Sequence, residues 1–342
     1  SSIGRYEAQR IDHYDFRLHG SFNGEYYNGY GSVSYHKAKI SENGGIMDEA
    51  LISDPNPEEK DMYKKPEDLP VNMMNAVNKT SLYRIFYTHS LDLAHVERLD
   101  IDSTVYEVPV MTAFHTIHLE TSHREFKMSS LPKDTSMLNE IFPNELEDGQ
   151  KFPFYDKART ADSTRYFSLK NIFQLKMTEE FNSLLRFGVR AFLETEINLY
   201  TYPDFPQTTE KETQYGDIEK TFHYRKKKSD FTDDLRMSIG GEISKHRGEN
   251  LSFSAMAKCY FMGYREGDFV IDGHINTSFP FLKSTASVWG QCLAERRSPD
   301  FWEEKYISNV YQWDNDLNAE QSLNVRGGIR IGQLNTEVTG YF

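Results

Sequence analysis

Oxygen-bearing side chains recur at every second position in the segment WDNDLNAE, residues 313–320. They are Asp314, Asp316, Asn318 and Glu320. Carboxylate and amide oxygens at alternating positions are the ligands of the first half of a calcium-binding loop. The segment lacks the glycine of that loop's sixth position, where Ala319 stands, and the acid of its twelfth, where Val325 stands. Calcium is therefore a weak candidate, and we expect an acidic loop tip that binds no metal.

Two further groups of residues have types that could do chemistry. The segment HTIHLETSH contains His115, His118 and His123, but a strand would point His115 and His118 to opposite faces, which indicates isolated histidines. The basic run RKKK, residues 225–228, could bind lipopolysaccharide phosphates from an outer loop, although such runs are more often simply solvated. The sequence contains no nucleophile elbow, phosphate-binding loop, dinucleotide glycine pattern or zinc-protease helix. We therefore expect no catalytic residue and no cofactor.

The elements that must position such residues are strands, because apolar and polar residues alternate along much of the chain. In LLRFGVRAFLETEINLY, residues 184–200, one parity is almost continuously apolar and the other carries four charges. Successive strand side chains point to opposite faces, so such a strand has one apolar and one charged face. The same alternation occurs in 235–244, 251–261, 269–279 and 322–332, and more weakly in earlier segments.

The length of these segments favours a membrane barrel over a soluble sheet. We count roughly 11 or 12 strands, many of about 10 to 13 residues, which suits a membrane-spanning strand better than the five or six residues usual in soluble sheets. A mean hydropathy of −0.66 argues against membrane helices, whereas alternating barrel strands average to a polar value. The 23 Phe and 21 Tyr would supply aromatic girdles. We therefore expect an all-β fold, a transmembrane antiparallel up-and-down β-barrel with lipid outside and water inside.

The charged parity supplies the candidate site. In a barrel these side chains would line or plug the interior, where rings of charge set ion preference. The alternative is that they pair across neighbouring strands and leave no open channel. The candidate pore-lining residues are Arg186, Arg190, Glu194, Glu196, Arg236, Glu242, Lys258, Asp272, Arg326 and Arg330.

The connections between the strands also predict a barrel. Four long polar loops, at about 41–80, 129–165, 201–230 and 295–321, fall on one side when strands are counted, as extracellular loops would. Short links fall on the other side, including a hairpin turn at Asn28–Gly29. An excursion at 91–110 would face the periplasm. We expect 1–342 to form a single barrel domain that is incomplete at its ends, so that the strand count is a lower bound.

Composition restricts the partners. A formal net charge of −13 makes a nucleic-acid partner improbable. The two cysteines, Cys259 and Cys292, provide no disulfide framework and fall on the apolar parity of their strands, where small buried or lipid-facing residues are expected.

Three longer segments resemble a known family. They are RYEAQRIDHYDFRLHGSFNGEYYNGYGSVSYHKA, LISDPNPEEKDMYKKPEDLPVNM and YISNVYQWDNDLNAEQSLNVRGGIRI, and together they are similar to the putative porin family of Bacteroidetes outer membranes. The resemblance implies a large antiparallel outer-membrane barrel with a role in solute passage. It carries over no catalytic residue.

We therefore expect a cell outer membrane protein, not an enzyme, through which small hydrophilic solutes or ions diffuse passively. Its partners would be these solutes, outer-membrane lipid and lipopolysaccharide. The alternative is a non-conducting structural barrel that docks lipoproteins, other barrels or the assembly and secretion machinery through its loops and the 91–110 excursion. A third possibility, an outer-membrane hydrolase, has no Ser-His-acid group in the sequence to support it.

Overall fold

The computed structural model describes most of the chain. The described residues are 2–53, 57–99, 105–129, 160–180, 187–203, 207–212, 218–223, 226–228, 234–246, 250–281, 284–308, 312–331 and 336–341. Within them, strands dominate and helices are short. None of the helices in these ranges has the length and hydropathy that crossing a membrane requires.

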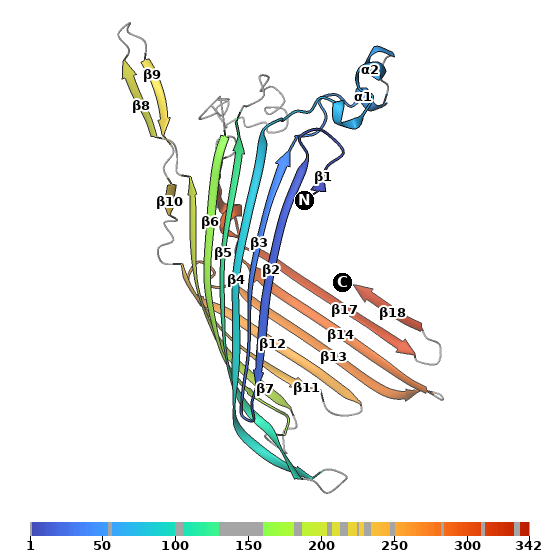
Figure 1. Ribbon diagram of the computed structural model, residues 1–342. Coiled ribbons are helices and arrows are strands. Elements are labelled where there is room, and N and C mark those ends of the chain that lie inside the picture. The colour runs from blue at the N-terminus through green and yellow to red at the C-terminus, as the bar shows by residue number, and fades with distance from the viewer. Residues whose placement is uncertain are drawn as a thin grey trace.

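One antiparallel sheet of 14 strands contains most of the described residues (Figure 1). Its strands in spatial order are β1 (Ser2–Ile3), β2 (Arg10–Asn23), β3 (Tyr27–Glu42), β4 (Ala76–Leu99), β5 (Val105–Met128), β6 (Thr160–Met177), β7 (Gly188–Pro203), β11 (Leu235–Lys245), β12 (Leu251–Met262), β13 (Phe269–Phe281), β14 (Ser284–Arg297), β17 (Glu320–Ile331) and β18 (Thr336–Tyr341), with β10 (Lys226–Lys228) paired to β7. Apart from the short β1 and β10, twelve strands follow one another in an up-and-down order. This confirms the expected all-β, antiparallel class.

The remaining elements lie in the connections at one end of the sheet (Figure 1). The connection after β3 holds α1 (Ala50–Ser53), α2 (Pro57–Met62) and the 3-10 helix η1 (Pro66–Asp68), and the one after β7 holds the hairpin of β8 (Gln207–Glu212) and β9 (Ile218–His223). The connection after β14 holds α4 (Phe301–Glu304) and the pair β15 (Lys305–Ile307) and β16 (Gln312–Asp314). Most of the expected 129–165 loop lies outside the described residues.

Strands β4 and β5 are longer than the sequence predicted. The 91–110 interval was expected to leave the sheet, yet β4 continues to Leu99 and β5 begins at Val105, so that each strand is 24 residues long. Pairs such as Asp92↔Thr112 and Glu97↔Glu107 extend the ladder, and Thr112 donates a 2.7 Å hydrogen bond to Asp92. The result is a hairpin that projects beyond the other strands at the end with the short turns (Figure 1).

The turn between β2 and β3 also lies elsewhere than predicted. Asn28 and Gly29 belong to β3, where Asn28 pairs with Asn23 and Gly29 with Phe22. The prediction of a turn at Asn28–Gly29 was therefore wrong. The chain reverses at residues 24–26, where the amide of Gly24 donates to the carbonyl of Tyr27 at 2.9 Å. The register of the β2–β3 ladder therefore differs from the one that the Asn-Gly signal predicted.

The two faces of the sheet have opposite composition, and the apolar one is exposed. On β7, Glu194 and Glu196 are 6% and 8% exposed, whereas Ile197 and Leu199 are 42% and 47% exposed. On β13, the exposed residues Ile271, Ile275 and Phe279 share the outward parity. This arrangement is the reverse of that in a soluble protein, where large apolar side chains are buried and acids are exposed.

The sheet is curved, and in the described residues its two ends are not paired with one another. The order begins at β1 and ends at β18, and Figure 1 shows these two ends apart. The architecture is that of an open, curved up-and-down sheet, which is consistent with a barrel.

Substituting Ile275, at the middle of β13, tests which face meets lipid. Ile275→Arg should lower the free energy of unfolding in lipid vesicles by about 2 to 4 kcal/mol, because a cation at the bilayer midplane is costly. Asn276→Arg is the matched control, since Asn276 is the next residue along the strand and its side chain points to the polar face. Chemical denaturation measures both variants, and an equal loss in the two would contradict the assignment.

Candidate functional site

The centre of the polar face is a network of charges that crosses four neighbouring strands. The ammonium of Lys170 on β6 lies 3.5 Å from the carboxylates of both Glu194 and Glu196 on β7. Lys258 on β12 donates to Glu194 at 2.9 Å, and Ser168 donates to Glu196 at 3.2 Å. Both acids are buried, so their charge is compensated by two cations and a hydroxyl.

A second set of contacts lies nearer the short-turn end of the same strands. Arg190 on β7 forms an ion pair with Glu242 on β11 and donates a 3.3 Å hydrogen bond to Gln174 on β6. These side chains are more exposed than those at the centre, with Arg190 at 39% and Glu242 at 21%. The polar face is therefore more exposed to solvent toward this end.

Phe192 interrupts the polar parity of β7, and a glycine accommodates it. Gly240 is the cross-strand partner of Phe192, and a Cβ added at Gly240 would lie 2.2 Å from the ring. The ring therefore lies flat over the glycine, and the Arg190 guanidinium sits 5.7 Å from its centroid. The apolar residue thus covers the wall without projecting from it.

Toward the end with the long connections, the buried pair of Arg236 and Asp234 continues the network. Arg236 donates to both carboxylate oxygens of Asp234, at 2.9 and 2.8 Å, and lies 3.5 Å from the hydroxyl of Tyr200. A two-point contact of this kind fixes the guanidinium plane. It also places Tyr200 for the contact with the β14–β17 connection.

In its described residues, 298–308 and 312–319, that connection folds onto the polar face. Phe301 of α4 is 2% exposed and stacks on Tyr200 at 4.1 Å between ring centroids. Tyr202 and Trp302 complete the aromatic cluster, and Tyr166 packs against it. Because Tyr166, Tyr200 and Tyr202 lie on the same parity as Glu194 and Glu196, the connection covers the inner side of the sheet.

The root of this connection is fixed by Asp268, which is 1% exposed. Its carboxylate accepts hydrogen bonds from the amide and the hydroxyl of Ser298, each at 2.9 Å. Arg265 and Arg296 contact it as well, at 2.9 and 3.1 Å. The turn between β12 and β13 thus holds the start of the inward connection in place.

A cavity of about 630 Å³ lies between the inward connection and the sheet. Trp302, Tyr306 and Trp313 line it on the side of the connection, and His36 and Arg124 line it on the side of the sheet. Tyr306 and Trp313 stack at 4.8 Å, and the Trp313 indole donates to the carbonyl of Trp302 at 2.9 Å. The connection therefore holds its own shape where it narrows the space over the polar face.

Six of the ten predicted pore-lining residues lie together on three adjacent strands. They are Arg190, Glu194, Glu196, Arg236, Glu242 and Lys258. Asp272 lies one strand further, 3.2 Å from His274, and Arg326 and Arg330 lie on β17, where Arg326 donates to Asn324 at 2.9 Å. Arg186 lies outside the described residues. The assignment of these residues to a pore stays a prediction.

Two of the weak calcium candidates form ion pairs with different cations. Asp314 accepts from Lys305 at 2.9 Å, and Glu320 lies 3.4 Å from Arg297. Asp316 and Asn318 lie between them, exposed. Arg225 of the basic run lies outside the described residues, and the backbone of Lys226–Lys228 forms β10.

Sequence reasoning missed the partners that complete the network. Lys170 stands in a segment with weaker alternation. Arg84 and Glu120 also come from such segments, and they lie 2.6 Å apart across β4 and β5. The parity of each strand contained the signal, since all three lie on the polar parity. The docking of Phe301 had no such signal, because a four-residue helix in a polar connection shows no periodicity.

Comparison with known proteins adds one finding. The model of a family described as "Putative porin" matches residues 1–341. No curated protein matches the chain.

Substituting Phe301 tests the docking of the inward connection. Phe301→Ala should release residues 298–308 and 312–319 from the sheet, because truncating a buried Phe costs about 3 to 5 kcal/mol. Limited proteolysis of the folded protein should then cut within these ranges much faster. Leu317→Ala, at an exposed position of the same connection, is the control and should leave the rate unchanged; equal rates for wild type and Phe301→Ala would contradict the docking.

Proposed function

The chain belongs to the putative porin family, and from this premise we propose that it is a barrel of the outer membrane through which small hydrophilic solutes or ions diffuse passively. The observation that carries the proposal is the inversion of exposure on β7, where Glu194 and Glu196 are buried and Ile197 and Leu199 are exposed. Side chains of this kind are stable on those faces when lipid lies outside the sheet and water inside. The family and the all-β fold point to a non-enzymatic channel.

The borders of the apolar face support a membrane-spanning band. Toward the long connections, the outward parity ends in charges such as Lys37, Lys39 and Lys79. Toward the short turns it carries an aromatic cluster, in which the Tyr27 hydroxyl lies 2.9 Å from that of Tyr87 and His115 stacks on Phe173 at 4.3 Å. Aromatic residues with a polar atom favour the membrane interface.

The polar face supports passage along a charged wall. Two of its ion pairs join neighbouring strands, and the pair of Lys258 and Glu194 reaches across β11, so the charged side chains lie along the polar face of the sheet. The inward connection narrows the space near its entrance, where Trp302 and Trp313 face the sheet across the cavity. Selection would then rest on the size of the entrance and on the balance of charge below it.

One observation favours the alternative of a non-conducting scaffold. The β4–β5 hairpin extends beyond the other strands at the short-turn end, which would be periplasmic. A lipoprotein or a component of assembly or secretion machinery could dock there. The two functions differ in one measurable property, because a scaffold would be folded and silent in a planar bilayer.

We further propose that lipopolysaccharide phosphates contact the outward lysines near the long connections. Lys39 and Lys79 face each other directly across β3 and β4, and the Glu125 carboxylate, which lies 3.5 Å from the Lys79 ammonium, also pairs with Lys127. Three lysines therefore stand beside one carboxylate, a surplus of like charge that an added anion would compensate. Lys37 stands two residues away on the same face, exposed. Asp12, the other cross-strand partner of Lys39, is engaged by Arg10 at 3.0 Å.

Single-channel recording in planar bilayers tests the channel. Wild type should give stable steps. Lys170→Gln should shift the reversal potential in a salt gradient toward cation preference, because it removes the cation between Glu194 and Glu196. Lys37→Gln is the matched control, with the same change of charge on the outward face. A folded protein without steps would favour the scaffold, and equal shifts in both variants would contradict the polar face as the path.

Lipopolysaccharide binding tests the outward lysines. The double variant of Lys39→Gln and Lys79→Gln should bind lipopolysaccharide roughly 30-fold more weakly, from about 1 kcal/mol per lysine near an anionic surface. Lys170→Gln and Lys258→Gln, which change two charges on the polar face, are the control. Unchanged affinity in the outward variant would refute this contact.

A further inference from the structure

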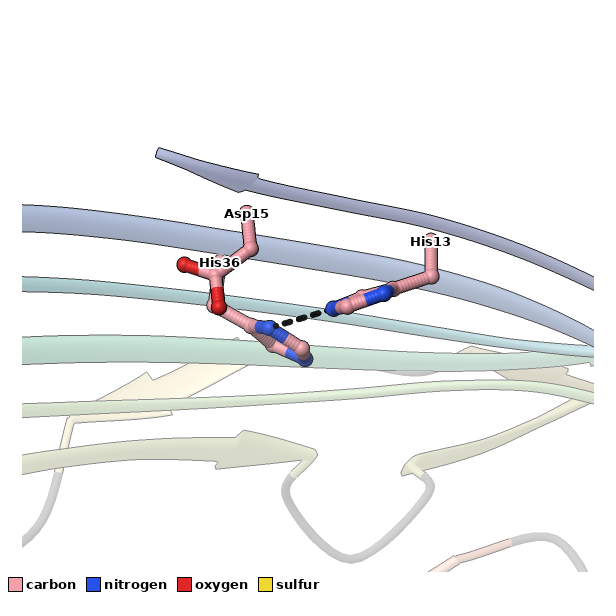
Figure 2. Close-up of side chains that lie close together, drawn as sticks. All are labelled: His13, Asp15 and His36. Carbon is pink, nitrogen blue, oxygen red and sulfur yellow. Dashed lines mark hydrogen bonds between the residues drawn. The ribbon is translucent and has the colours of Figure 1, made fainter. Parts of the chain in front are cut away.

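A second group of residues on the polar face, apart from the charged network, has the composition of a metal site. His13 and Asp15 stand two residues apart on β2, so their side chains share a face. Asp15 lies directly opposite His36 on β3. One ligand atom from each residue lies within 4.8 Å of the other two. Among the described residues, this is the one group of three such side chains that is close enough to hold a metal ion. Figure 2 shows the two rings meeting beside the carboxylate.

The spacing of the two imidazoles matches that of two ligands on one ion. The Nε2 of His13 lies 3.1 Å from the Nδ1 of His36. Two nitrogens that each lie about 2.0 to 2.1 Å from a metal ion are about 2.9 Å apart at a right angle and about 3.3 Å apart at the tetrahedral angle. The observed separation falls between these values and is thus the spacing that two nitrogen ligands of one ion have.

The donor set selects a class of metal. Imidazole nitrogens with one carboxylate suit divalent first-row transition metals, whereas Mg²⁺ and Ca²⁺ take oxygen ligands. Without metal, one ring donates its N–H to the other. Coordination needs that proton on the other nitrogen of the same ring, which is a change of tautomer and leaves both imidazoles neutral.

The surroundings keep the group accessible and the carboxylate oriented. His13 and Asp15 are exposed and His36 is half-buried. Arg17 holds the Asp15 carboxylate through contacts of 3.1 and 3.4 Å, as outer groups commonly hold a carboxylate ligand. His36 also lines the cavity beneath the inward connection. An ion at this position would therefore be reached from the water-filled side of the sheet.

We propose that His13, Asp15 and His36 bind one divalent transition-metal ion of the Zn²⁺ class on the polar face near the entrance. The site provides three protein ligands and leaves the remaining positions to water, as in open zinc sites. The proposal depends on the pairing of β2 with β3 and not on whether the protein conducts, so it can fail or succeed independently of the proposed channel.

Zn²⁺ titration by calorimetry on tag-free, folded protein tests the site. Wild type should bind one ion per chain, and His13→Ala, His36→Ala and Asp15→Asn should each weaken binding by about tenfold or more. His19→Ala is the matched control, because His19 is exposed on the same face of β2 but outside the group. Electron paramagnetic resonance of the Cu²⁺ form should show two coupled nitrogens in wild type and one in either histidine variant.

The outcomes separate the site from adventitious binding. Loss of affinity confined to the three ligand variants supports it. No binding by wild type, equal weakening by His19→Ala, or two coupled nitrogens remaining in His13→Ala would each overturn it. Unchanged heat-dependent migration on gels would establish that the variants are folded, and all four substituted residues are at least partly exposed, so folding should survive the changes.

Discussion

Each long strand has one apolar and one polar face, as a strand between lipid and water requires, and the rest of the structure depends on that constraint. In lipid, every backbone donor and acceptor must find a partner within the sheet, which favours long, continuous antiparallel ladders. The side chains then need only match the solvent on their own face. Ile239 and Ile243 on β11 are exposed on one side, while Arg236 and Ser238 are buried on the other. The usual hydrophobic core is small here because, among the described residues, no other part of the protein packs on the apolar face.

The same constraint explains why the charges of the polar face are paired. An isolated buried carboxylate would be costly, and Glu194 is compensated by Lys170 on the adjacent β6 and by Lys258 on β12, which reaches it across β11. Such pairs also fix neighbouring strands in register, since each one spans a ladder. Aromatic packing takes over where the inward connection docks, with Phe301 against Tyr200 and Tyr202. The polar face is thus charged at its centre and aromatic where the connection docks.

Alternation along single strands was enough to predict the fold class and the face on which each residue lies. The side chains of β7, β11 and β12 follow the predicted parity, and Cys259 and Cys292 are exposed on the apolar side as expected. Alternation alone does not determine register. A turn at Asn28–Gly29 would pair Asp15 with Glu42, whereas the turn at residues 24–26 pairs Asp15 with His36. The group with His13 was invisible for that reason. The inward docking of residues 298–308 and 312–319 depends on contacts distant in sequence, which periodicity does not report.

Thiol accessibility along β14 tests whether lipid and water lie on opposite faces of the sheet. Single cysteines would be placed in turn at positions 287–293 in a background with Cys259→Ala, and with Cys292→Ala for every position except 292 itself. Folded protein in vesicles would then be treated with a water-soluble thiol reagent. If lipid lies on one face and water on the other, the reactive positions should alternate along the strand. We expect reaction at the positions of Ser287, Trp289, Gln291 and Leu293 and protection at Val288, Gly290 and Cys292. Uniform reactivity, or reaction at the second set, would contradict this arrangement of lipid and water.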